Sequence, residues 1–239
     1  MPAFRAVSFD FHDTVAICPT WFQLEVRHLA SVTHASLVSS GHSAGGPSHE
    51  ALDAAYRQLR QEIHAHGNEQ DALGCVMTVF RRLGIDCDQA VVADTIDTLM
   101  LATSADLRPR PGIQEVVLQL AALNLPMGIT SNAVYHPFLE WALASFGIRD
   151  HFTSVITSAS CGFYKSRPEI YAQTAAALGV PVGDLVHVGD SFRFDVLPVS
   201  RLGGRAVWLN LGGVEPPEPA ATLVVPSLDG LVDRLLALA

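Results

Sequence analysis

The feature that most constrains the fold is the stretch AVSFDFHDTV at residues 6–15. It opens with the uncharged, β-prone run Val7-Ser8-Phe9, which stops at Asp10 and is followed by the polar group His12, Asp13 and Thr14. In open parallel α/β sheets, ligands bind at the carboxyl ends of the strands. A carboxylate at that edge can be a nucleophile, a metal ligand or a helix cap, and this stretch alone leaves all three open.

Length and composition narrow the class of protein. The chain has 239 residues, of which 49% are hydrophobic, enough for one large core and a smaller domain. The formal net charge of −9 argues against a nucleic-acid partner or an anionic membrane, because either needs a basic surface. The oligomeric state is left open.

Cysteine usage and hydropathy predict where the protein works. The four cysteines are scattered without CxxC spacing, so they indicate neither a disulfide framework nor a zinc site. No apolar run reaches about 18 residues, the length of a membrane span. We expect a soluble cytoplasmic protein.

The basic residues are distributed unevenly between arginine and lysine. Lys165 is the only lysine, and the other fourteen basic residues are arginines. Arginine presents a planar fork of donors, whereas lysine is a compact point charge. We therefore expect that Lys165 occupies a site that requires an ammonium group.

Helical periodicity dominates from about residue 20 to residue 103. Apolar residues recur there at spacings typical of four or so amphipathic helices. The polar, glycine-rich segment 39–48 predicts a loop between the first two. An all-helical insertion directly after a catalytic-looking strand suggests a lid.

Six histidines and two arginine pairs fall within this helical region. No histidine pair has the i, i+4 spacing and nearby acid of a helical zinc site, so we expect solvent-facing histidines. We make the same prediction, a solvated helix face, for the arginine pairs. These residues are His28, His34, His42, His49, His64, His66, Arg57/Arg60 and Arg81/Arg82.

Strands and helices alternate in the remainder of the chain. The patterns predict strands near 125–130, 152–157, 185–188, 205–209 and 222–225, and helices near 111–123, 135–146, 168–178 and 228–238. Pro111 suits the first turn of its helix. Such alternation predicts a parallel sheet with helices on both faces.

Polar residues follow four of these strands. Asp10 follows the first, Ser131 and Asn132 the second, Lys165 lies on the loop after the third, and Asp190 and Asp195 follow the fourth. Each alone would be weak, because polar residues after strands commonly cap helices. Together they predict one polar cluster at one edge of the sheet.

The ordered motifs resemble those of the haloacid dehalogenase superfamily, most of whose members are phosphatases. The matching segments are DFHDT at 10–14, ITSN at 129–132, GFYKSRP at 162–168 and GDSFRFD at 189–195. The resemblance implies a Rossmann-like, doubly wound α/β core domain of residues 1–16 and 106–239. It also implies that residues 17–105 form an all-helical cap domain.

The resemblance further implies a Mg²⁺-dependent phosphatase that hydrolyses a small phosphorylated metabolite. Asp10 would form an aspartyl-phosphate, and Mg²⁺, which prefers oxygen ligands, would be held by Asp10, the backbone carbonyl of His12 and Asp190. Asp195 would be a further ligand or a support for the ligands. Ser131 and Asn132 would bind phosphoryl oxygens, and Lys165 would neutralise charge on nucleophile and substrate.

The chain departs from the family pattern at His12. Phosphatases of the family carry a second Asp there, which serves as general acid and then as base. Asp13 is an acid one residue later, and its side chain should point elsewhere. Arg167 also departs from the pattern, which suggests a contact with substrate.

Two alternatives follow from His12. Dehalogenases of the superfamily also lack the second Asp, so a 2-haloacid dehalogenase is one. The other is a catalytically silent fold that serves as a binding or regulatory module.

Overall fold

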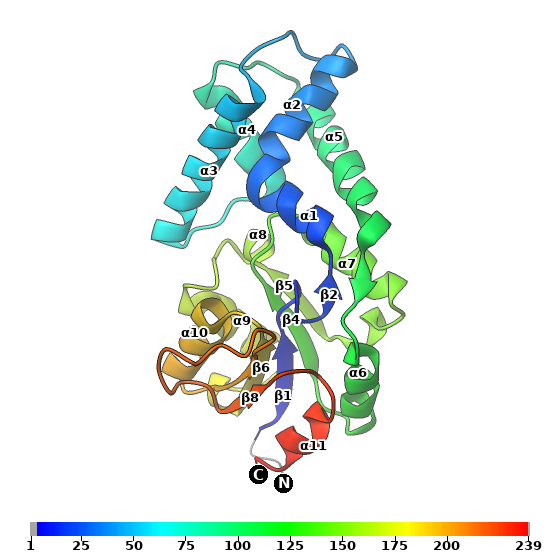
Figure 1. Cartoon of the computed structure of the whole chain (residues 1–239), viewed down its shortest axis with the longest axis vertical. Helices are drawn as coiled ribbons and strands as arrows, with labels where there is room; N and C mark the ends of the chain where they lie inside the picture. Colours follow the sequence, from blue (N-terminus) through cyan, green and yellow to red (C-terminus); the bar gives the residue numbers. More distant parts are fainter. Residues whose placement is uncertain (1–3, 239) are drawn as a thin grey trace.

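A parallel sheet of six strands organises the lower half of the molecule in Figure 1. A computed structural model describes residues 4–238 of the chain. The strands lie in the order β5-β4-β1-β6-β7-β8, so β1 pairs with β4 on one side and β6 on the other. Their bounds are β1 Ala6–Phe9, β4 Met127–Ser131, β5 Ser154–Thr157, β6 Leu185–Gly189, β7 Arg205–Leu209 and β8 Leu223–Val225.

Helices cover both faces of this sheet, and β1 shows how the sequence separates them. All four residues of β1 are buried, as expected for a central parallel strand. Val7 and Phe9 belong to the main core, which includes residues of α6 and α7, whereas α9 and α10 contribute to a second core. The helices are α6 Ile113–Ala122, α7 His136–Ser145, α8 Ser158–Cys161, α9 Pro168–Ala177, α10 Leu197–Arg201 and α11 Leu231–Leu236. The predicted doubly wound α/β fold is confirmed.

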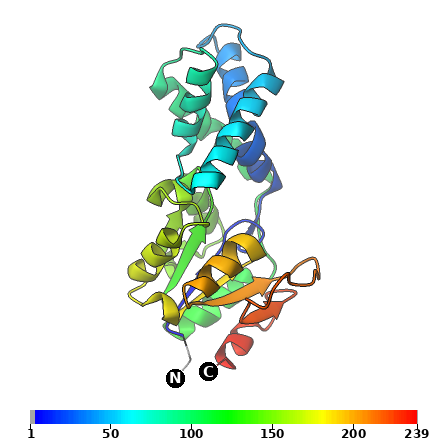
Figure 2. The same ribbon diagram turned by 90° about the vertical axis from the view of Figure 1, so that its left-hand side faces the viewer.

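Within the described chain, the regular structure between β2 (Ala16–Ile17) and β3 (Arg108–Pro109) is helical and includes no strand, as the periodicity predicts. Its α-helices are α1 Pro19–Gln23, α2 Leu29–Ser39, α3 His49–His66, α4 Ala72–Arg82 and α5 Gln89–Ala102. One π-helical turn, Leu24–His28, joins α1 to α2, and a 3₁₀ turn, Thr103–Asp106, follows α5. Figure 2 shows these helices stacked on one end of the sheet-containing part. None of the helices within residues 4–238 combines the length and apolar character that crossing a bilayer requires.

Backbone hydrogen bonds join the helical segment to the sheet-containing part in two places. At the first, β2 and β3 pair antiparallel, so the outgoing and returning chains lie side by side. At the second, the backbone after α3 bonds to loops that follow β4 and β5. The N–H of Tyr164 donates to the carbonyl of Gly67 at 2.9 Å, and the N–H of Glu69 donates to that of Gly162 at 2.9 Å. The N–H of Ala72 adds a bond of 2.8 Å to the carbonyl of Val134.

Two expectations about local structure are wrong. Pro111 lies outside α6, which begins at Ile113 after Gly112, because Gly112 has a φ of +86° that starts the helix two residues later. His34 is only 5% exposed and packs edge-on against Phe80, with ring centroids 5.8 Å apart. Its side chain completes the packing inside the helical segment rather than facing solvent.

A buried carboxyl group also connects the helical segment to the sheet-containing part. Glu25, in the π-helical turn, is 5% exposed, and its Oε1 accepts a hydrogen bond of 2.9 Å from the N–H of Val134. Its Oε2 is buried without a partner among the described residues. Burial raises the pKa of Glu25 to about 8, although the Val134 N–H and the Arg60 guanidinium oppose this. Glu25 is therefore largely protonated in the native state at pH 7.

We predict that Glu25→Gln stabilises the protein increasingly as the pH rises from 5 to 8. In the unfolded chain a glutamate ionises near its ordinary pKa of 4.5, whereas in the native state it holds its proton to about pH 8. The unfolded state is thus favoured progressively across this range, at about 1.4 kcal/mol per unit of pKa difference. The free energy of unfolding of Glu25→Gln, relative to wild type, should rise by a few kcal/mol between pH 5 and pH 8.

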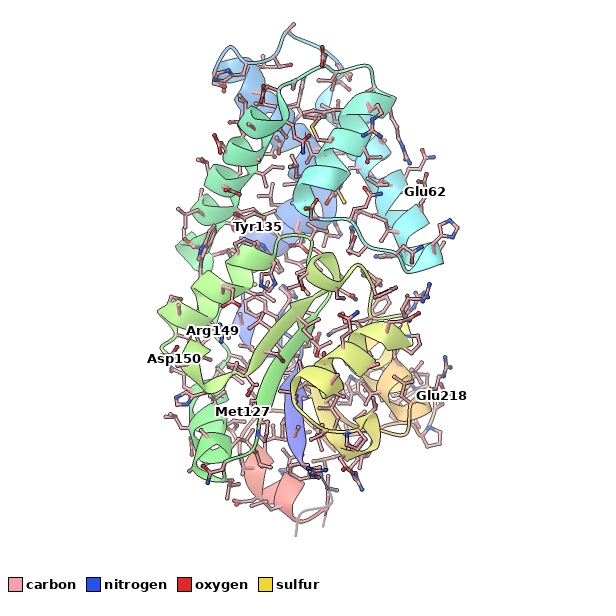
Figure 3. The ribbon with its side chains drawn as sticks, turned by 180° about the vertical axis from the view of Figure 1, so that it is seen from behind. Glu62, Met127, Tyr135, Arg149, Asp150 and Glu218 are labelled. Atoms are coloured by element: carbon pink, nitrogen blue, oxygen red, sulfur yellow. The ribbon has the colours of Figure 1, made fainter. Side chains whose placement is uncertain are left out.

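Chemical denaturation across this pH range measures the effect. Glu62→Gln is the matched control, because Glu62 lies on the surface seen in Figure 3 and pairs with Arg82 at 2.7 Å. An exposed pair contributes little to stability, so this control should show only a small change. A difference between Glu25→Gln and wild type that stays constant with pH would contradict the protonated state of Glu25.

Candidate active site

Polar side chains from neighbouring strands meet at the carboxyl edge of the sheet. Asp10 follows β1, Ser131 ends β4 and Asp190 follows β6, and both β4 and β6 are hydrogen-bonded to β1. The Ser131 hydroxyl donates to Oδ1 of Asp10 at 3.3 Å. Carboxylate oxygens of Asp10, Asp190 and Asp195 all lie within 4.8 Å of one another. The sheet order therefore brings residues far apart in sequence into one cluster.

Lys165 lies inside this cluster with its side chain 1% exposed. Its Nζ donates to Oδ1 of Asp10 at 2.5 Å and to Oδ1 of Asp195 at 2.6 Å. Burial alone would lower the pKa of Lys165, but the two carboxylates outweigh burial and raise it. The side-chain oxygen of Asn132 accepts from the backbone N–H of Lys165 at 2.7 Å, which fixes the start of the lysine side chain. Lys165 is thus a buried cation held between two acids.

Both carboxylate oxygens of Asp195 have hydrogen-bond partners within the protein. Its Oδ1 accepts from Lys165 and lies 3.2 Å from Nε2 of His187, while its Oδ2 accepts from the N–H of Ser191 at 2.8 Å. Burial would raise the pKa of Asp195, but Lys165 and His187 lower it to about 2. Of the two roles expected for Asp195, support of neighbouring groups fits these contacts better than direct metal ligation.

Asp190 contrasts with Asp195 because its carboxylate has no hydrogen-bond or ion-pair partner within residues 4–238. Burial, together with the nearby Asp10 and Asp195 carboxylates, raises the pKa of Asp190 to about 8. Two or three carboxylate oxygens beside space for water and phosphate form the donor set that Mg²⁺ prefers. The arrangement therefore fits a hard divalent cation, which would relieve the repulsion between these acids.

His12 lines the same cavity as Asp10. Its ring stacks on that of Phe22, with centroids 4.0 Å apart and planes 18° apart. Burial lowers the pKa of His12, although Asp13 and Asp10 oppose the shift. Asp13 adopts a left-handed conformation, φ 59°, and pairs with Arg110 at 2.8 Å. His12 lines the cavity, whereas Asp13 does not, although Oδ2 of Asp13 lies 3.5 Å from Nδ1 of His12.

A cavity of about 330 Å³ lies above the cluster, between the sheet edge and the helical segment. Its floor contains the predicted polar residues, and its walls are mainly aromatic. The wall residues are His12, Trp21, Phe22, Glu25, Val26, Arg60, His64, Tyr164 and Phe194. None of the six residues from the helical segment was predicted to line the site, because helical periodicity shows which face of a helix is apolar but not which helix ends reach a distant sheet.

Arg60 corrects the expectation of a solvated helix face. Its guanidinium makes two hydrogen bonds to Glu69, of 2.6 and 2.9 Å, and Glu69 is fully buried at its side chain. Glu69 also accepts from the hydroxyl of Ser158 at 3.0 Å. The pair thus holds a cation of the helical segment beside the cavity, whereas Arg57 is exposed as expected.

The structure does not bring Arg167 to the cavity. Its guanidinium pairs with Glu169 at 2.5 Å and lies over the ring of Phe163, 5.6 Å from the centroid. Because the partner acid is only two residues away, this local pair directs Arg167 along the surface. The suggested contact with substrate finds no support in this position.

Comparisons with known proteins agree with these features. The family model for haloacid dehalogenase-like hydrolases matches residues 4–203. The chain is 25% identical to the glyceraldehyde 3-phosphate phosphatase of Methanopyrus kandleri over 231 residues, 96% of this chain and 93% of that protein. It is 28% identical to the protein of that name from Methanocaldococcus jannaschii over 232 residues, 96% of each chain.

Solved structures give the same fold. A 2-haloacid dehalogenase from Pseudomonas syringae pv. Tomato DC3000 superposes with a TM-score of 0.74 at 19% identity, covering 99% of this chain and all of the other. At that identity the likeness concerns the fold alone. Because the family model spans well over half of its residues, the chain belongs to the haloacid dehalogenase-like hydrolases.

Proposed function

We propose that this protein is a divalent-metal-dependent phosphatase that hydrolyses a small phosphorylated metabolite. The observation that carries the proposal is Asp190, a largely buried carboxylate without a cationic partner among the described residues, next to Asp10. Displacement of halide by Asp10 needs no such second acid, whereas phosphate binding beside Asp10 needs added positive charge. The relatives that are glyceraldehyde 3-phosphate phosphatases support the same reaction class.

Asp10 and Asp190 would hold the metal, which we propose to be Mg²⁺, with the backbone carbonyl of His12 as a further ligand. The bound ion would supply positive charge against both the carboxylates and the phosphoryl group. Asp195 would act beside this site by holding Lys165.

Asp10 is the proposed nucleophile. One of its carboxylate oxygens would form a bond to phosphorus as the bond from phosphorus to the leaving oxygen breaks, giving an aspartyl-phosphate. Water would then cleave this intermediate and release phosphate. Lys165 and Ser131, which both contact Oδ1 of Asp10, would orient the carboxylate for the attack.

His12 would transfer the protons. Its imidazole faces the cavity two residues after Asp10, so it can donate a proton to the leaving oxygen and later accept one from the attacking water. Stacking on Phe22 would hold the ring in place.

The helical segment would select the substrate. We propose that residues 17–105 form a cap domain over a core domain of residues 1–16 and 106–239. Six cavity residues come from the helices, including Glu25, Arg60 and His64. These side chains lie above the reacting phosphate and would contact the rest of the substrate.

The Asp10→Asn variant should lose all phosphatase activity while retaining the wild-type fold. An amide is a poor nucleophile and carries no charge for a cation. We expect wild type to hydrolyse p-nitrophenyl phosphate only with Mg²⁺ or a similar hard cation. Circular dichroism of the variant checks its fold. Equal wild-type rates in Mg²⁺ and in EDTA would contradict the metal assignment, and an active variant would contradict the nucleophile.

Lys165→Arg should be as inactive as Lys165→Met. The ammonium fits between two carboxylate oxygens at 2.5 and 2.6 Å, and a forked guanidinium cannot occupy that point-charge position. Steady-state rates of both variants measure this. A conservative Arg81→Lys on the helical segment serves as control and should leave the rate unchanged. Recovery of near wild-type turnover in Lys165→Arg would refute the requirement for an ammonium.

His12→Ala should lower turnover by about a hundredfold or more, the usual scale for lost proton transfer. The loss should be largest for alkyl phosphates, whose leaving groups need a proton, and smaller for p-nitrophenyl phosphate. His12→Asp should recover turnover, because a carboxyl group can take over both proton transfers. Unchanged rates of His12→Ala on both substrates would remove His12 from the mechanism.

The second candidate is a 2-haloacid dehalogenase. Dehalogenases of the superfamily lack the second Asp, and this chain lacks it too, because His12 stands at that position. A screen of phosphate esters and 2-haloacids, with and without Mg²⁺, separates the two. Halide release that is independent of metal would favour the dehalogenase. Absence of turnover on every compound, in wild type and His12→Asp, would favour a binding or regulatory module.

A further inference from the structure

A chain of buried hydrogen bonds runs behind the site and ends at Lys165. Oγ of Ser8 lies 2.8 Å from Nδ1 of His187, and Nε2 of His187 lies 3.2 Å from Oδ1 of Asp195. The same oxygen accepts from Lys165 Nζ at 2.6 Å. None of these four residues is more than 1% exposed. The proposed reaction gives His187 no part, so a fully buried imidazole here requires an explanation.

The pairing of strands in the sheet brings the residues of this hydrogen-bond network together. In the β1–β6 register Ser8 is the direct partner of His187, and both lie on the opposite face from Val7 and Phe9. The ring of Tyr171 packs edge-on against His187, with centroids 5.1 Å apart and planes 77° apart. A Cβ at Gly189 would lie 2.2 Å from Cγ of Asp195, so glycine allows the carboxylate to approach the strand. The backbone thus leaves one narrow place for Asp195, beside His187.

The direction of each bond follows from the chemistry of Asp195. An ionised carboxylate can only accept, so Nε2 of His187 carries a hydrogen and donates it, whether or not the imidazole is charged. In the neutral ring Nδ1 is then an acceptor, and the Ser8 hydroxyl donates to it. Ser8 therefore holds the orientation of the His187 ring, and the His187 ring holds the carboxylate of Asp195.

We propose that His187 is a positioning residue, which locks Asp195 and through it holds the Lys165 ammonium against Asp10. Lysine loses more side-chain entropy on ordering than most residues, so its placement depends on partners that cannot move. Lys165 has two carboxylate partners, and one of them, Asp10, is the proposed nucleophile and must move when it attacks phosphorus. Asp195 is then the fixed partner, and His187 keeps it fixed. The kinetic consequence rests on the proposed phosphatase activity, but the structural consequence does not.

Two substitutions of His187 form a matched pair. The amide nitrogen of His187→Gln reaches the position of Nε2 and can donate to Asp195, whereas that of His187→Asn reaches only the position of Nδ1. Both replacements are polar and smaller than histidine, so both leave space in the core. Thr130→Val is the control for loss of a buried hydrogen bond. Oγ1 of Thr130 lies 2.8 Å from Oγ1 of Thr174, and neither residue belongs to the hydrogen-bond network of Ser8, His187, Asp195 and Lys165.

The single lysine makes a direct measurement possible. In untagged protein labelled with ¹⁵N-lysine, the one side-chain ammonium resonance belongs to Lys165. We expect a slowly exchanging signal in wild type, His187→Gln and Thr130→Val. In His187→Asn the exchange rate should rise by about tenfold or more, the scale on which groups that orient a site act. If His187→Asn does not fold, Ser8→Ala is measured instead, and it should give faster exchange than Thr130→Val.

Kinetics with a phosphate ester provide the second readout. For His187→Asn, kcat should fall by about 10–100-fold with KM nearly unchanged, and His187→Gln should recover most of kcat. Equal ammonium exchange in His187→Asn and His187→Gln would overturn the positioning role. A wild-type enzyme without phosphatase activity but with the expected exchange pattern would contradict the proposed function and leave the role of His187 standing.

Discussion

The ion triad of Lys165, Asp10 and Asp195 is the interaction on which the site depends. An isolated ammonium with 1% of its side chain exposed would carry a desolvation cost of several kcal/mol, and only close carboxylates offset it. The strand order that puts β1 beside β6 is therefore also a condition for burying this cation. Asn132 contributes from β4 by holding the backbone of Lys165. Residues that follow β1, β4 and β6 thus all contact Lys165, which lies on the loop after β5.

The charges around the cavity follow a simple pattern. Each buried cation there has its own acid: Lys165 has Asp10 and Asp195, and Arg60 has Glu69. Asp190 at the floor and Glu25 in the roof lack a cationic partner among the described residues, and burial raises the pKa of both to about 8. The buried cations beside the cavity are thus paired with acids of the protein. Asp190 and Glu25 are the acids at which a bound molecule or ion can supply the missing partner.

Much of the fold follows from the sequence, because alternation of strand and helix patterns fixes a parallel sheet. The same rule places Asp10, Ser131 and Asp190 at one edge without knowledge of distances. The wall of the cavity does not follow in this way. Arg60 meets Glu69 only because the chain turns at Gly67, and Glu69 meets Ser158 only because α8 follows β5. Arg167 lies outside the cavity, where its guanidinium pairs with Glu169 two residues away and donates to the carbonyl of His66.

The two separate connections of the helical segment limit its motion. A body joined at one point can swing in any direction, whereas a body joined at two can turn only about the line between them. Tilting the helices away from the sheet about the β2–β3 pair must break the bonds of Gly67, Glu69 and Ala72, each worth about 1 kcal/mol. Side-chain bonds from the N–H of Val134 to Glu25 and from the hydroxyl of Tyr135 to Asp97 also cross between the two parts, so tilting the helices off the cavity costs several hydrogen bonds at once.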